Sequence, residues 1–288
     1  WKDVDWRTAI RDLRDSTPFM LSGVLQQAGT SGMVMLITSK LGPSALPAFT
    51  TVRTMVNLWT TISSTVTAPL LADVIRFHAT RGIDKLLMLA DAHAWLAGSI
   101  INVGVVALYP FMVYAYAYWT HGVLVLDAML LTTLLGAALL TNAYAFAAMY
   151  LHGINNRQTA IWMAFLRTGI ALGIGAMAAG FGIAGFGAGI LVAELVCFLY
   201  VARGPFRTVI ARMGGKAKFM RLGWTAASLG CAALFLAVAP SASIASIVIY
   251  VVSLCGMVFA SWMGWRRLDV QVRTRFAALT FGSIRAKT

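Results

Sequence analysis

The sequence predicts an all-α, polytopic membrane protein, a transmembrane helical bundle of about eight spans. Of its 288 residues, 59% are hydrophobic and only 11% are charged, whereas a soluble domain has about 25% charged residues. The apolar residues form runs of about 20 or more, long enough for a helix to cross a bilayer core of about 30 Å. These runs do not alternate polar and apolar residues, as the strands of a membrane barrel do.

The basic residues predict how the spans are oriented. We expect spans at residues 17–39, 46–75, 86–112, 122–149, 158–179, 183–202, 222–240 and 243–264. Most of the 23 lysines and arginines lie before the first span, after the last, or in every second loop, such as 76–85 and 203–221. Because basic loops stay in the cytoplasm, both ends of the chain are expected there, and residues 113–121 outside.

This arrangement divides the chain into five regions. They are a cytoplasmic amphipathic segment (1–16), a six-helix transmembrane lobe (17–202), a basic cytoplasmic loop (203–221), two additional transmembrane helices (222–264) and a basic cytoplasmic tail (265–288). An alternative for the first segment is an ordinary charged flank with incidental periodicity. The chain begins with Trp1 rather than Met, so we expect a fragment. Orientation in the membrane accounts for the net charge of +13, and we therefore expect no nucleic-acid partner.

The second span is unusually long. Residues 46–75 would make a helix of roughly 45 Å at the usual rise per residue, longer than the hydrocarbon core. Pro69 lies in its inner half and removes a backbone donor, which predicts a kink there. A kinked helix suits gating, so Pro69 is our candidate gating residue.

Two ionisable residues are expected at membrane depth on consecutive helices. Arg167 lies ten residues after Arg157, and Glu194 lies nine residues before Arg203, which places both about 14–15 Å from the cytoplasmic side. An ion pair between them is geometrically available. Such a pair could have the structural role of holding the two helices together. Alternatively, Arg167 could bind an anionic ligand after release from Glu194, and both interpretations stay open.

A third basic residue, Arg53, lies within the second span, about 10 Å from its outer end. It could snorkel outward, or it could line a cavity and bind a phosphate or carboxylate. Asn57 lies one turn further along, and we include it with Arg53, Arg167 and Glu194 among the candidate substrate-binding residues. Uncharged polar groups in spans more often form hydrogen bonds between helices, and Asn142 is another such residue.

The remaining motifs indicate packing rather than chemistry. Two GxxxG pairs, Gly169 with Gly173 and Gly185 with Gly189, are expected to let helix backbones approach closely. Neither HExxH, GxSxG nor a Walker loop occurs. We therefore expect no enzyme activity, no catalytic residues, no metal and no cofactor.

Several short motifs resemble one transporter family. They are Leu41-Gly42-Pro43, Ala48-Phe49, Val52-Arg53-Thr54, Pro69, Asp84-Lys85, Leu151 to Arg157, Gly182-Ile183-Ala184-Gly185 and Ala188. Across most of residues 17–203 the chain resembles the polysaccharide and O-antigen flippases of the multidrug/oligosaccharidyl-lipid/polysaccharide exporter superfamily. Where that family usually has a proline-glutamate pair, this chain has Pro69-Leu70.

The resemblance implies a fold and a function. The family has two six-helix lobes around a central cavity, often with two extra C-terminal helices, so eight spans would match the second lobe and that pair. The N-terminal lobe of the same protein would be a partner. We therefore expect a flippase that moves a lipid-linked glycan across the bacterial cytoplasmic (inner) membrane by alternating access. Alternatives are a cation-coupled drug or small-molecule exporter of the same superfamily, a membrane glycan polymerase or ligase, and an inactive partner subunit.

Overall fold

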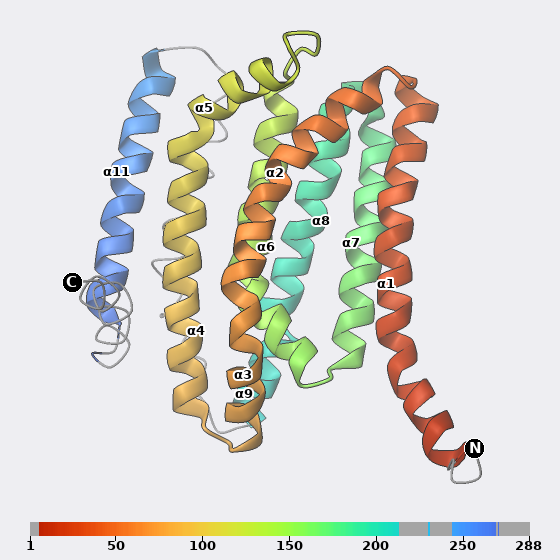
Figure 1. The fold of residues 1–288 in the computed structure, drawn as a ribbon, viewed down its shortest axis with the longest axis vertical. Coiled ribbons are helices and arrows are strands. Elements are labelled where there is room, and N and C mark those ends of the chain that lie inside the picture. The colour runs from red at the N-terminus through yellow and green to blue at the C-terminus, as the bar shows by residue number, and fades with distance from the viewer. Residues whose placement is uncertain (1–5, 213–229, 231–243, 269, 271–288) are drawn as a thin grey trace, which may run out of the picture.

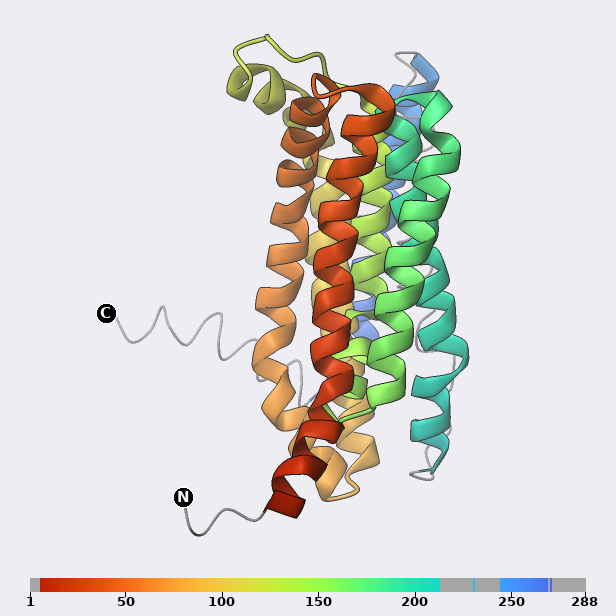
Figure 2. The same cartoon turned by 90° about the vertical axis from the view of Figure 1, so that its right-hand side faces the viewer.

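The computed structural model describes residues 6–212, 230, 244–268 and 270. Long helices lie side by side along one axis in both views (Figures 1 and 2). The described residues contain no strand. The predicted all-α helical bundle is therefore confirmed.

The elements of the bundle follow one another with short connections. In chain order they are α1 (Trp6–Leu41), α2 (Ala45–Thr67), η1 (Ala68–Leu70), α3 (Leu71–Ala79), α4 (Ile83–Ala97), η2 (Gly98–Asn102), α5 (Val103–Trp119), α6 (Ala128–Gly153), α7 (Arg157–Met177), η3 (Ala178–Phe181), α8 (Ile183–Arg203), α9 (Pro205–Arg212) and α11 (Ile244–Arg267).

Six helical stretches of the described chain are long and apolar enough to cross a membrane, which supports a multi-pass membrane protein. They are Ala45–Ala79, Ile83–Trp119, Ala128–Gly153, Arg157–Phe181, Ile183–Ala211 and Ile247–Arg266. They correspond to the predicted second to sixth spans and to the eighth. The seventh, 222–240, lies outside the described residues except for residue 230, and the total of eight stays a prediction.

The predicted first span, 17–39, lies within α1 but is not one of these six. Its sequence includes Gln26, Gln27 and Thr30, which lower its average hydropathy. Residues 6–16, predicted as a separate segment, form the first turns of the same helix. These turns bend away from the bundle (Figures 1 and 2).

The helix that contains the third span extends further than predicted. Residues 113–119, expected in an outer loop, belong to α5, which ends only at Trp119. The last part of α5 turns across the end of the bundle (Figure 1), and the helix contains Pro110, whose ring removes a backbone donor. The connection to α6 is therefore the shorter segment 120–127.

At Pro69 the backbone changes from α to 3-10 geometry over Ala68–Leu70 and then continues as α3 to Ala79. The whole stretch from Ala45 contains 35 residues, so the second span is even longer than predicted. The basic turns that follow α3, α6 and α8 lie at one end of the bundle, and the turns that follow α1, α5 and α7 lie at the other (Figure 1). This is the alternation that the basic residues predicted.

Glycines let α7 and α8 approach closely, but only one predicted pair takes part. A Cβ on Gly189 would lie 2.7 Å from the carbonyl oxygen of Ala171 on α7, and one on Gly185 would lie 2.0 Å from that of Ala178. Gly169 and Gly173 are exposed, and no atom of the described residues lies within 4 Å of such a Cβ. The close approach predicted for this second pair is therefore wrong.

Candidate functional site

A polar cavity lies in the middle of the bundle between α1, α2, α6, α7 and α8. Its volume is about 340 Å³. All four candidate substrate-binding residues line it: Arg53 and Asn57 from α2, Arg167 from α7 and Glu194 from α8. The structure thus brings together side chains that are up to 141 positions apart in the sequence.

The packing of α1 and α2 explains why a cavity forms here. α1 packs along α7, and α2 packs along α6, whereas contact between α1 and α2 is slight by comparison. The two helices are joined by a short turn at one end of the bundle (Figure 1). The cavity occupies the space between them, with α8 behind it.

Arg167 and Glu194 form an ion pair in the wall of the cavity. The Nε atom of Arg167 is 2.8 Å from Oε1 of Glu194, and Nη2 of Arg167 donates a hydrogen bond of 3.0 Å to Oε2. The Glu194 side chain is only 8% exposed, whereas that of Arg167 is 35% exposed. The pair that the sequence made geometrically available is therefore formed, with its cation nearer the cavity.

Tyr144 of α6 completes this network, and no sequence pattern predicted it. Its hydroxyl donates to Oε2 of Glu194 and accepts a 2.5 Å hydrogen bond from Nη2 of Arg167. Tyr144 lies nine residues before Gly153, the end of α6, so its depth matches that of Arg167 and Glu194. The depth of Tyr144 could have been predicted by counting residues along α6 from the basic end of the bundle.

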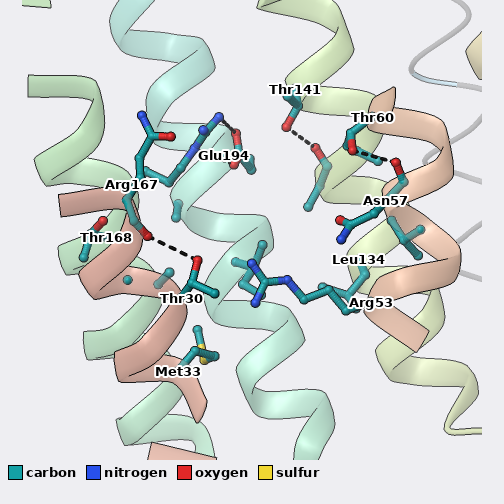
Figure 3. Close-up of a pocket in the computed structure, with 18 residues that line it drawn as sticks. Thr30, Met33, Arg53, Asn57, Thr60, Leu134, Thr141, Arg167, Thr168 and Glu194 are labelled. Atoms are coloured by element: carbon teal, nitrogen blue, oxygen red, sulfur yellow. Dashed lines mark hydrogen bonds and ion pairs between the residues drawn. The ribbon is translucent and has the colours of Figure 1, made fainter. Parts of the chain in front are cut away.

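Arg53 extends from α2 into the cavity (Figure 3). Its side chain is partly buried. Among the described residues, no carboxylate forms an ion pair with it, and no hydrogen-bond acceptor contacts it. A guanidinium with five donors is therefore available in the cavity.

Asn57 is exposed on the same face of α2, one turn beyond Arg53. Its carbonyl oxygen accepts 2.9 Å hydrogen bonds from the hydroxyls of Thr60 and Thr61, while its side chain has no partner in the described part of the chain. Asn142 behaves differently, because it accepts from Ser63 at 2.8 Å and donates to the carbonyl of Ala97 at 3.3 Å. Asn142 therefore joins three helices, as was expected for such residues.

Pro69 does not line the cavity. It is exposed and lies in the 3-10 turn that follows α2, closer to the basic end. Its gating role stays a prediction, and any effect on the cavity would have to act through the direction of α2.

A second, smaller cavity of about 130 Å³ lies between α1, α6 and α7. It shares Gln26 and Arg167 with the first, and it extends past Thr159 to Asn156 at the start of α7. At that end, Nη1 of Arg157 is 2.5 Å from a carboxylate oxygen of Asp15. Arg167 thus lines both cavities, and the smaller cavity extends from it toward the basic end.

The described residues hold no group of three or more side chains suited to binding a metal ion. Comparison with models of protein families, with curated proteins and with solved structures finds no significant match to the chain.

Proposed function

We propose that this chain is part of a flippase that moves a lipid-linked oligosaccharide or polysaccharide precursor across the bacterial cytoplasmic membrane by alternating access. The observation that carries the proposal is Arg53, a guanidinium without a protein partner among the described residues, in a cavity at membrane depth. Ionisable side chains at this depth are costly and usually serve a ligand or a pathway.

The charge of the cavity favours an anion. Its charged lining residues are Arg53, Arg167 and Glu194, and the ion pair between the last two leaves one positive charge in excess. A guanidinium binds phosphate through two parallel hydrogen bonds, and in surroundings of low dielectric such bonds are strong. The diphosphate of a lipid-linked glycan is an anion of this kind.

The same charge argues against a cation-coupled drug exporter. Glu194 is the one carboxylate among the residues that line the cavity, and both of its oxygens are occupied by Arg167 and Tyr144. A cationic drug would find no available acid there. No observation on the described residues favours a membrane glycan polymerase or ligase, or an inactive partner subunit.

The exposed polar face beside the cavity supports a second lobe. Gln26 of α1 and Asn57 of α2 are exposed at membrane depth, and neither side chain has a partner in the described part of the chain. Unsatisfied polar groups are costly in lipid. We therefore propose that this face borders a water-filled cavity closed on its other side by an N-terminal lobe of the same protein.

The basic end of the bundle is the proposed cytoplasmic side. In this orientation the glycan would enter from the end that carries Arg157 and Arg203 and leave near the turn 42–44. The proposal is tested with purified full-length protein in liposomes that contain a fluorescent lipid-linked oligosaccharide. We expect transfer between leaflets, measured by accessibility to an added glycosidase, to exceed that of protein-free liposomes. Equal transfer in both would refute the proposal.

A further inference from the structure

We propose that the last part of α5, residues 111–119, lies in the headgroup region of the outer leaflet and binds lipid through exposed aromatic side chains. The aromatic face, as we call it, consists of Phe111, Tyr114 and Tyr118, with Trp119 beside it. The inference does not depend on the proposed function, because this face lies apart from the cavity.

The length of the helical stretch is the first argument. Ile83–Trp119 is one membrane-crossing stretch of 37 residues. A straight helix of that length would measure roughly 55 Å, whereas a bilayer with its headgroup regions is about 40–45 Å thick. The part from Ile83 to Pro110 already measures roughly 40 Å. The residues after Pro110 therefore either project into water or run along the membrane surface.

The course of the helix favours the membrane surface. The last part of α5 turns across the end of the bundle (Figure 1) and extends to one side, beyond α2 (Figure 2). Pro110 lacks a backbone donor, which permits this bend. One edge of the segment is fixed to the protein, because Met112 and Tyr116 are buried in the main hydrophobic core. The segment therefore lies at the end of the bundle opposite the basic turns.

The remaining surface of this segment is exposed and aromatic. Tyr114 is 76% exposed and Tyr118 is 84% exposed. Phe111, Tyr114 and Tyr118 recur every three or four residues, so they share one face of the helix. α5 contains no charged residue. Large aromatic side chains without charges beside them are unfavourable in water, which argues against projection of the segment into water.

The exposed side chains change in character along the stretch. Before the bend they are aliphatic, as at Ile100 and Leu108, and after it they are mainly tyrosine and tryptophan. Tyrosine and tryptophan gather where the hydrocarbon core meets the headgroups, because their rings are apolar and their polar tips stay hydrated. The hydroxyls of Tyr114 and Tyr118 and the indole N–H of Trp119 have no partner in the described part of the chain. They are therefore available to the phosphate and ester oxygens of lipid, which is the occupant that this order of side chains fits.

The test is electron paramagnetic resonance of a nitroxide attached to Tyr118→Cys, in full-length protein reconstituted in liposomes and without the three native cysteines. Power saturation measures collisions of the nitroxide with oxygen, which concentrates in lipid, and with the water-soluble complex Ni(II)-EDDA. The controls are Val123→Cys, exposed in the turn before α6, and Val251→Cys, exposed within the membrane-crossing stretch of α11. We expect the ratio of oxygen to nickel collisions at Tyr118→Cys to lie between the two controls and to exceed that of Val123→Cys severalfold.

Tyr114→Cys is the second test position on the same face, and it should give the same result. A ratio at both positions as low as that of Val123→Cys would place the aromatic face in water and overturn the inference. A ratio as high as that of Val251→Cys would place it among the acyl chains and overturn the headgroup position. Few collisions with either reagent would show that protein covers the face, such as the proposed N-terminal lobe, and would also overturn the inference. None of these outcomes changes the proposed flippase function, which transfer in liposomes tests separately.

Discussion

Arg167 and Glu194 join α7 to α8 through two atom pairs, Nε to Oε1 at 2.8 Å and Nη2 to Oε2 at 3.0 Å. The glycine contacts bring these helices together about one turn away, where Gly189 of α8 meets Ala171 of α7. The ion pair therefore lies in an interface whose backbones are already close. The Glu194 side chain, which is only 8% exposed, therefore has little access to water when its partner is lost.

The first prediction follows from that burial. Arg167→Ala leaves the 8% exposed carboxylate of Glu194 without its cation, and we expect a loss of stability of up to about 3–5 kcal/mol. The double variant Arg167→Ala with Glu194→Gln removes the unpaired charge and should recover much of this loss. Thermal unfolding in detergent measures both.

The difference in stability between the single and the double variant shows whether the ion pair contributes to folding. If the double variant is as unstable as Arg167→Ala, the loss comes from packing of the arginine side chain and the ion pair contributes nothing to folding. Lys40→Ala serves as the control, because Lys40 is an exposed basic residue at the end of α1. It should unfold at the wild-type temperature.

The second prediction uses two glycines of the neighbouring helices. Gly189→Ala would place a methyl group 2.7 Å from the carbonyl oxygen of Ala171, and forcing such a contact costs about 1–3 kcal/mol. Gly173→Ala meets no atom of the described part of the chain within 4 Å and replaces a poor helix former, so it should be neutral or stabilising by up to about 1 kcal/mol. Unfolding of the two variants under one set of conditions gives the difference. Equal stability would contradict the close packing of α7 and α8.

The third prediction concerns which end of the bundle faces the cytoplasm. In a background without Cys197, Cys231 and Cys255, a membrane-impermeant maleimide added to intact cells should label Val123→Cys. It should not label Thr208→Cys until the membrane is opened. Val123 is 80% exposed in the turn before α6, and Thr208 is exposed on α9 at the basic end. Labelling of Thr208→Cys in intact cells would show that the orientation is the reverse of the one predicted.

The sequence predicted those cavity residues whose side chains cost much free energy to place within a membrane. A charge at membrane depth is expensive, so Arg53, Arg167 and Glu194 stood out among apolar neighbours, and all three line the cavity. Tyr144 was missed because a phenol ring is compatible with an apolar span and its hydroxyl does not stand out. Only the packing of α6 on α8 shows that this hydroxyl reaches Glu194.

Other features depend on the direction that a residue faces. Gly169 and Gly173 have the same spacing as Gly185 and Gly189, but they lie on the exposed side of α7. Spacing alone cannot tell these sides apart. The end of α5 was misplaced because residues 113–119 alternate tyrosine with small apolar residues, a composition that suits both a helix end and a loop at the membrane surface.

The last prediction concerns Arg53. Its guanidinium lies in the cavity without a protein partner among the described residues, so its removal leaves no buried carboxylate unpaired and should not disturb folding. In the full-length protein we expect Arg53→Ala to abolish glycan export while membrane insertion and thermal stability stay normal. Arg53→Lys keeps the charge but loses the planar fork that holds a phosphate through two hydrogen bonds, so it should retain part of the export.

Surface glycan per cell, measured at native expression, reports the export. The control is Arg76→Ala, which removes an arginine that is 65% exposed and paired with Asp73 outside the cavity, and it should export normally. Normal export by Arg53→Ala would show that this arginine binds no anion during transport. Loss of export in both Arg53→Ala and Arg76→Ala would indicate that export depends on positive charge in general rather than on an anion site in the cavity. The order expected for an anion site is wild type equal to Arg76→Ala, then Arg53→Lys, then Arg53→Ala, because only the last two change the group that would bind the phosphate.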